Sequence, residues 1–296
     1  MLRISKNRII LTISTFFLLI SVWVFFLVGE KVQHYGDLSK VINYSQVNFA
    51  GEKVSFEGKY YYNIEKFEKE LSVTRFNMYQ FVLYHKREPL YIPYIEKKLK
   101  AAGIPDDFKY LAIAESGLRN ESLSSAGAGG IWQFIPDTAR QYGLQVTDTV
   151  DERYNFELAT DAAIAYFQKL YKDFHDWTLV AAAYNRGENW LRRALDDQKV
   201  ASYYDLYMNE ETTRYVFRIL AIKYLMENKY KIFNKDELWD VFIKPKIHIV
   251  EVSDVSDIKD WCQEKKYDYA MVRQLNQWIL GNNLPKGDWK IQVLDL

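Results

Sequence analysis

The longest apolar stretch of the chain lies near its start. Residues 9–28 are all apolar or carry a small hydroxyl, with Arg3, Lys6 and Arg8 before them and Glu30 and Lys31 after them. An apolar helix of this length can cross the ~30 Å hydrocarbon core of a bilayer, and the basic flank favours a cytoplasmic N-terminus. The pattern therefore predicts a membrane anchor over residues 1–30, with the rest of the chain on the far side of the membrane.

A cleaved signal peptide is the alternative to an anchor. Its apolar stretch usually has roughly 7–15 residues and is followed by small residues in an A-x-A pattern, which Leu27, Val28 and Gly29 match poorly. We therefore favour an uncleaved anchor. We expect no lipid attachment, because no cysteine lies near the N-terminus.

The middle of the chain shows helical periodicity. Residues 31–60 have no sustained period and predict a tether with a short strand pair, whereas apolar positions at helical spacing begin near Ile64 and continue beyond Ile92. We divide this region into a tether and helical lead-in over residues 31–88 and a helical domain over residues 89–235.

Local signals place several helices of that domain. Pro105 suits a helix start, Asn155 and Asp176 suit N-caps, and Gly187 suits a helix end. The predicted helices cover residues 105–116, 156–174, 177–184 and 210–228.

The pattern changes after Pro245. Residues 247–252 and 289–294 favour strands, and residues 254–265 and 268–279 favour two short helices between them. The fold class is therefore mainly α, with a small α+β module over residues 246–296.

Composition excludes several classes of function. The 296 residues carry 39 basic and 39 acidic side chains, so a net charge of zero argues against nucleic acid as a partner. The single cysteine, Cys262, excludes an internal disulfide, and four scattered histidines form no ligand cluster. We expect no metal and no cofactor. The 23 tyrosines and 8 tryptophans suit stacking on sugars, although most aromatics in any chain belong to the core.

Candidate chemistry centres on the stretch from Leu111 to Gln133. Glu115 ends an apolar helical run, and Leu111 and Leu118 are expected beside it. A carboxyl against such a wall loses hydration, which raises its pKa, so Glu115 is our candidate general acid. A glutamate that reaches into water at the helix end is the alternative.

A loop rich in small residues follows at 122–130, where backbone can approach a ligand closely. A phosphate-binding loop is the competing interpretation, but no G-K-[ST] ending is present. Gln133 closes the stretch among apolar neighbours. Either a ligand or local backbone must satisfy its amide.

Four motifs occur in order over about a hundred residues. They are Glu115-Ser116; Ser124, Gly127, Ala128, Gly130 and Gln133; Ala183, Tyr184, Asn185 and Gly187; and Glu211, Thr212, Tyr215 and Val216. This set resembles the lytic murein transglycosylases of the soluble-transglycosylase (goose-lysozyme-like) superfamily. Because Ile131-Trp132-Gln133 stands where other members have L-M-Q, the chain is most similar to the membrane-bound transglycosylase D subgroup.

The resemblance implies a lysozyme-like domain that cleaves the β-1,4 bond between N-acetylmuramic acid and N-acetylglucosamine in peptidoglycan and leaves 1,6-anhydro ends. It implies Glu115 as the catalytic acid and then base, and a location at the bacterial inner membrane with the domain in the periplasm or cell exterior. It also implies substrate-binding roles for Ser124, Gln133, Tyr184, Asn185 and Tyr215. Backbone capping is the alternative for Gln133, helix capping for Asn185, and a core position for each tyrosine.

Two rival functions stay open. A goose-type muramidase would use water as the nucleophile, with Asp137 or Glu121 as a second carboxylate, and a wall-binding scaffold would hold glycan without cleaving it. The chain also departs from the family after Glu115-Ser116: Leu118-Arg119-Asn120 replaces an aromatic and a proline. This leaves the details of the substrate subsites open.

The C-terminal module resembles a degenerate LysM glycan-binding domain. Its β-α-α-β order fits, but Ser253-Asp254-Val255-Ser256 replaces the usual G-D-T-L after the first strand. Glycan binding and packing against the larger domain are both open roles for it.

Overall fold

The computed structural model describes residues 42–234, 236, 238 and 240–295. The predicted anchor at 9–28 lies outside the described residues. Within the described residues, no helix combines the length and the apolar character needed to cross a membrane. Val47–Leu296 form one compact unit, and the unit before it contributes the 3-10 turn Tyr44–Gln46 to the described part.

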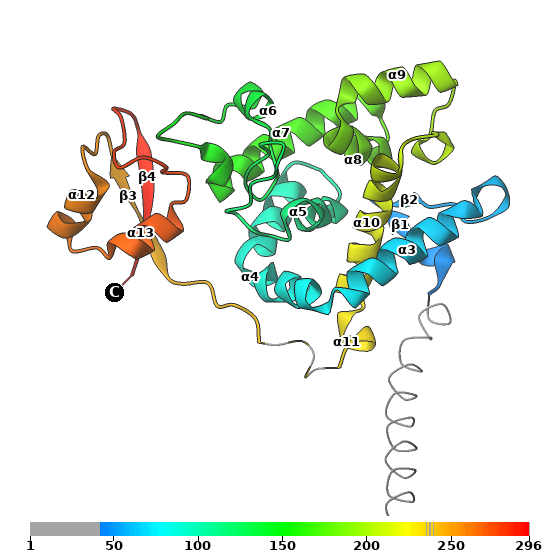
Figure 1. Cartoon of the computed structure of the whole chain (residues 1–296), viewed down its shortest axis with the longest axis horizontal. Coiled ribbons are helices and arrows are strands. Elements are labelled where there is room, and N and C mark those ends of the chain that lie inside the picture. The colour runs from blue at the N-terminus through cyan, green and yellow to red at the C-terminus, as the bar shows by residue number, and fades with distance from the viewer. Residues whose placement is uncertain (1–41, 235, 237, 239, 296) are drawn as a thin grey trace, which may run out of the picture. The chain divides into compact units, whose positions relative to one another are not determined.

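The prediction of a mainly α-helical chain is confirmed (Figure 1). The helices are α3 (Tyr62–Phe76), α4 (Met78–Ala101), α5 (Lys109–Ser116), α6 (Pro136–Gln141), α7 (Phe156–Phe174), α8 (Trp177–Arg186), α9 (Glu188–Gln198), α10 (Glu210–Glu227), α11 (Lys229–Ile232), α12 (Ile258–Lys265) and α13 (Tyr269–Leu275). The strands are β1 (Asn48–Phe49), β2 (Glu52–Lys53), β3 (Ile247–Val252) and β4 (Trp289–Leu294).

The core of the larger domain lies around α10, which contacts α3, α5 and α8. Helix α5 is buried along most of its length, and the run Ala181–Ala183 on α8 is fully buried. Small side chains let helix backbones approach closely, so α5 and α8 can both meet α10. This packing brings the ends of three helices, distant in sequence, to one place.

The predicted boundary between residues 88 and 89 lies inside α4, and the division of the chain into domains stays a prediction. The helix break comes earlier, at Asn77, whose side chain accepts a hydrogen bond from the backbone N–H of Gln80. Helix α3, assigned to the lead-in, packs on α10. Periodicity indicates which face of a helix is apolar but not where a domain begins. Because the apolar face of α3 continues onto α4 across the break, the pattern gave no signal for the break.

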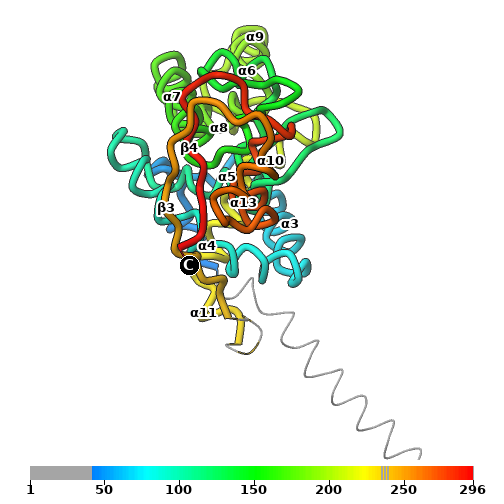
Figure 2. Tube along the Cα trace, turned by 90° about the vertical axis from the view of Figure 1, so that its left-hand side faces the viewer, coloured from blue at the N-terminus to red at the C-terminus, as the bar shows by residue number. Residues whose placement is uncertain are grey.

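The β-α-α-β order of the C-terminal module is confirmed. Strands β3 and β4 pair antiparallel, from Ile247 opposite Leu294 to Val252 opposite Trp289, and α13 packs against β4 (Figure 2). The second helix ends before the predicted residue 279. The buried side chain of Asn276 hydrogen-bonds the N–H and C=O of Gln292 on β4, at 2.8 and 2.7 Å, which fixes the chain out of the helix there.

The module packs against the segment before α7. The backbone N–H of Asp151 donates to the carbonyl of Trp278 at 2.9 Å, and that of Leu280 donates to the carbonyl of Thr149 at 2.8 Å. Val150 is 1% exposed and belongs to the hydrophobic core of the module. These contacts are those expected of the packing role.

Candidate active site

Glu115 lies in the last turn of α5, and a glycine fixes where that turn ends. Gly117 has φ +63°, and its N–H donates to the carbonyl of Ile113 at 2.8 Å. A Cβ at this position would lie 2.7 Å from Gln80 Nε2 and 2.8 Å from Tyr84 Cε1. Only glycine tolerates both the left-handed conformation and this approach, so the helix ends at Ser116, one residue after Glu115.

The surroundings of Glu115 make its carboxyl a weaker acid than that of an ordinary glutamate. Burial raises its pKa from 4.5 to about 7, although the hydrogen bond from Tyr215 and the charge of Arg218 act in the opposite direction. Tyr215 is 3% exposed, and its hydroxyl donates to Glu115 Oε1 at 2.5 Å. A carboxyl with this pKa exists in both protonation states near neutral pH, as a group that gives and then takes a proton requires.

The charge of Arg218 is shared with a buried glutamate. Glu70 is 1% exposed and lies 3.6 Å from Arg218 Nε, and it also pairs with Arg214. Arg218 lowers the pKa of Glu115 less than the hydrogen bond from Tyr215 does, and burial outweighs both. A cavity of about 240 Å³ lies beside this group and is lined by Ala114 as well as by these side chains.

The loop after α5 is joined to the helix by Ser116. Its hydroxyl donates to the carbonyl of Ile131 at 2.9 Å. Ser124, which the resemblance places near the catalytic glutamate, instead accepts from the backbone N–H of Ala128 at 3.0 Å and closes its own turn. In this structure Ser124 shapes the loop, and its role in substrate binding stays a prediction.

The side-chain amide nitrogen of Gln133 hydrogen-bonds local backbone, as the capping alternative predicts. Nε2 donates to the carbonyl of Gly130 at 2.8 Å and to that of Ser122 at 3.2 Å. The backbone of Gln133 has φ +52°, a conformation uncommon for residues other than glycine, so these bonds also hold strained backbone. A contact with saccharide stays a prediction for this residue.

Tyr184 and Asn185 lie in the last turn of α8, which continues to Arg186. The hydroxyl of Tyr184 donates to the carbonyl of Trp132 at 2.7 Å, and Asn185 is exposed. Burial, and next the charge of Glu115, raise the pKa of Tyr184, so this phenol lies near the acid and stays protonated. The structure thus brings Glu115, Tyr184 and Tyr215 together from α5, α8 and α10.

Residues 93–206 match the family model described as "Transglycosylase SLT domain". The match covers less than half of the chain, and the name SLT domain is used below for these matched residues alone.

Comparison with known proteins adds one relative in sequence and one similar solved structure. Over 185 residues the chain is 32% identical to membrane-bound lytic murein transglycosylase D of Escherichia coli (strain K12). The aligned residues make up 58% of this chain and 41% of the relative. The chain thus spans less than half of that protein. The 70 kDa soluble lytic transglycosylase of Escherichia coli is similar in structure at a TM-score of 0.41, with 20% identity, over 60% of this chain and 33% of that one.

One structural pair in the SLT domain was missed by the sequence analysis. Arg153 and Asp151 are 6% and 3% exposed and form a salt bridge of 2.6 Å. The guanidinium also donates to the carbonyl of Gly127 within the loop at 2.6 Å and to that of Phe134 beyond it at 3.0 Å. A Cβ on Gly130 would lie 1.9 Å from the carbonyl oxygen of Arg153, so this approach requires glycine. The sequence offers no signal for these contacts, because nothing local indicates which carbonyls the arginine will reach.

Proposed function

We propose that this chain is a lytic transglycosylase that cleaves peptidoglycan between N-acetylmuramic acid and N-acetylglucosamine, with Glu115 as its single acid and base. The observation that carries the proposal is the carboxyl of Glu115, whose pKa burial raises to about 7 within the SLT domain. The 32% identity to a lytic murein transglycosylase supports it. A lysozyme-like fold for residues 89–235 is part of the proposal.

The chemistry needs one carboxyl in two states. Protonated Glu115 gives its proton to the glycosidic oxygen as the bond to C1 breaks. The resulting carboxylate takes the proton of the muramoyl C6 hydroxyl as that oxygen bonds to C1, so the 1,6-anhydro product forms without water and Glu115 returns to its first state. Tyr215 bonds only Oε1 and stabilises the carboxylate between the two transfers.

A muramidase is the first rival, because hydrolysis by this fold would require a second carboxylate to activate water. Asp137 is 93% exposed in its side chain and pairs with Arg140, and Glu121 is also exposed. Neither position resembles the buried setting of Glu115. We therefore favour the single-carboxyl mechanism over the muramidase.

The module over residues 246–296 is proposed to be a LysM-like unit that braces the SLT domain. The carbonyl of Trp278 in the module accepts a hydrogen bond from the backbone N–H of Asp151. Asp151 forms the salt bridge that orients Arg153, and Arg153 in turn hydrogen-bonds the loop that follows Glu115. This chain of contacts gives the packing role a direct consequence for the active site. Glycan binding by the module alone has no comparable support.

The chain is proposed to be anchored in the bacterial inner membrane by residues 1–30, with the SLT domain in the periplasm or at the cell exterior. The apolar run at 9–28 and its basic flank support this. Fractionation and mass spectrometry test it: the mature protein should retain Met1 and stay with membranes. A mature N-terminus near Glu30 would reject the anchor.

The decisive experiment weighs the products. Full-length protein is incubated with peptidoglycan sacculi, and the soluble fragments should be lighter by one water per cut than hydrolysis products. Glu115→Gln should lower the rate by the ~10²–10⁴ typical of lost acid-base catalysis. Glu121→Gln and Asp137→Asn are the matched controls and should retain activity.

Each rival predicts a different outcome. Reducing-end products, with loss of activity in Glu121→Gln or Asp137→Asn, would establish the muramidase. Glycan binding without any products, in wild type and Glu115→Gln alike, would establish the scaffold.

A further inference from the structure

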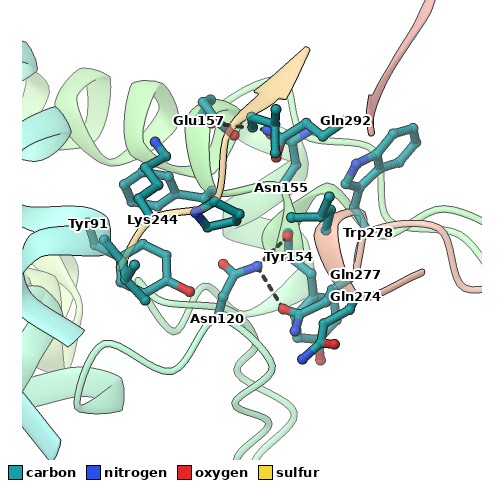
Figure 3. Close-up of a pocket in the computed structure, with 15 residues that line it drawn as sticks. Tyr91, Asn120, Tyr154, Asn155, Glu157, Lys244, Gln274, Gln277, Trp278 and Gln292 are labelled. Atoms are coloured by element: carbon teal, nitrogen blue, oxygen red, sulfur yellow. Dashed lines mark hydrogen bonds between the residues drawn. The ribbon is translucent and has the colours of Figure 1, made fainter. Parts of the chain in front are cut away.

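A second cavity lies where the SLT domain meets the C-terminal module (Figure 3). It has a volume of about 180 Å³ and is lined by Tyr91 and Asn120 from the larger domain, by Lys244 from the connecting segment, and by Gln274 and Trp278 from the module. Glu115, Tyr184 and Tyr215 are not among its lining residues. The cavity is therefore separate from the proposed catalytic group.

One buried polar atom at this cavity lacks a partner. Asn120 is 8% exposed, and its Nδ2 donates to the carbonyl of Tyr154 at 2.6 Å and to Gln277 Oε1 at 2.9 Å (Figure 3). These two acceptors fix which end of the amide is nitrogen. The other end, Oδ1, is buried and accepts no hydrogen bond in the described structure. Buried acceptors are nearly always satisfied, so this oxygen calls for a donor from outside the chain.

The remaining lining indicates the chemistry of that donor. The cavity is rich in side-chain amides, of which Gln274 is exposed, and Tyr91 supplies an aromatic wall, whereas the ring of Trp278 is buried in the core of the module and stacks on Trp289. One cation, Lys244, and one anion, Glu157, leave the lining without net charge. Such a site suits a neutral ligand that has both donors and acceptors and an apolar face, and it does not suit a phosphate or a carboxylate.

The volume of the cavity and the way into it limit the size of the ligand. Pockets for drug-sized ligands have ~300–1,000 Å³, so this smaller cavity holds about one sugar ring. Lys244 and Pro245 form one wall, are exposed, and belong to a segment without regular secondary structure. Because Asn120 Oδ1 is buried, a ligand reaches it only if this wall shifts.

We propose that this cavity binds one N-acetylhexosamine unit. Its acetamido N–H donates to Asn120 Oδ1, its hydroxyls meet the surrounding amides, and its ring face lies on the aromatic wall. A glycan held here contacts both the SLT domain and the module. The site does not depend on cleavage by Glu115, so its failure and the failure of the proposed catalytic function are distinguishable.

The test follows the side-chain amide signal of Asn120 by NMR in full-length Glu115→Gln protein, with ¹⁵N labelling. The signal is assigned by its loss in Asn120→Ala. N-acetylglucosamine should shift this signal, whereas glucose, which has a similar ring without the acetamido group, should not. Because the Asn120 signal is local, it separates sugar bound in this cavity from sugar bound near Glu115.

Two substitutions of exposed residues complete the test. Gln274→Trp fills the cavity and should weaken the response to N-acetylglucosamine by about tenfold or more, since it removes contacts and space together. Gln263→Trp, on α12 outside the lining, should leave it unchanged. An unshifted Asn120 signal, or an equal response in Gln274→Trp, would overturn the site. An equal response to glucose would overturn the assigned ligand.

Discussion

Replacing Glu115 with glutamine should stabilise the fold at alkaline pH. The pKa of Glu115 is about 7 in the folded chain against an ordinary value of 4.5. Below pH 4.5 the carboxyl is protonated in both the folded and the unfolded chain, so its ionisation does not change the free energy of unfolding. Between pH 4.5 and 7 the unfolded chain ionises freely while the folded chain resists, so the free energy of unfolding falls by ~1.4 kcal/mol per pH unit. Above pH 7 the loss is constant.

The size of this loss follows from the shift. A rise of about 2.5 pKa units corresponds to at most ~3.4 kcal/mol, and partial exposure of the side chain reduces it to about 2 kcal/mol. Glutamine has nearly the same shape, carries no charge, and can still accept from Tyr215. Glu115→Gln should therefore match the wild type near pH 4.5 and exceed its stability by about 2 kcal/mol at pH 8.

Denaturant unfolding at pH 5, 6, 7 and 8 measures the difference. Glu65→Gln, at an exposed glutamate on α3, is the matched control and should show no comparable dependence on pH. If Glu115→Gln were less stable than the wild type at pH 8, the folded chain would favour the carboxylate. The argument for a neutral acid held by burial would then be refuted.

Further predictions concern the groups around the acid. Tyr215→Phe removes a hydrogen bond to the carboxylate, so the pKa of Glu115 should rise by about 1–2 units and the alkaline limb of kcat/KM should move to higher pH by the same amount; an unmoved limb would contradict this. Arg153→Met leaves Asp151 buried without its cation and should cost ~3–5 kcal/mol in unfolding free energy, while the double variant Arg153→Met/Asp151→Asn should recover part of that cost. Gly117→Ala should lower both stability and kcat, since its Cβ meets Gln80 and Tyr84; unchanged kcat at lower stability would show that the helix end does not position Glu115. Val150→Asp buries a charge in the core of the module and should make residues 246–296 sensitive to protease; equal resistance to cleavage would contradict the packing role.

The sequence by itself determined the local features. Asn155 and Asp176 were predicted as N-caps of α7 and α8, and each accepts a hydrogen bond from the N–H three residues on. The environment of Glu115 was also predicted, because apolar residues one turn away on a helix must share its face. Such features depend on residues within a few positions, so periodicity and capping chemistry suffice to predict them.

Only the tertiary structure decided which distant groups meet. The hydrogen bond from Tyr215 to Glu115 joins residues 100 positions apart, and the resemblance rather than any local pattern suggested it. Arg153 could not be assigned to the loop carbonyls, and Val150 could not be assigned to the core of the C-terminal module, because both depend on how helices pack after they form. Which side chains are buried between elements depends on the shape and polarity of the surface that packs against them, and the local sequence does not specify that surface.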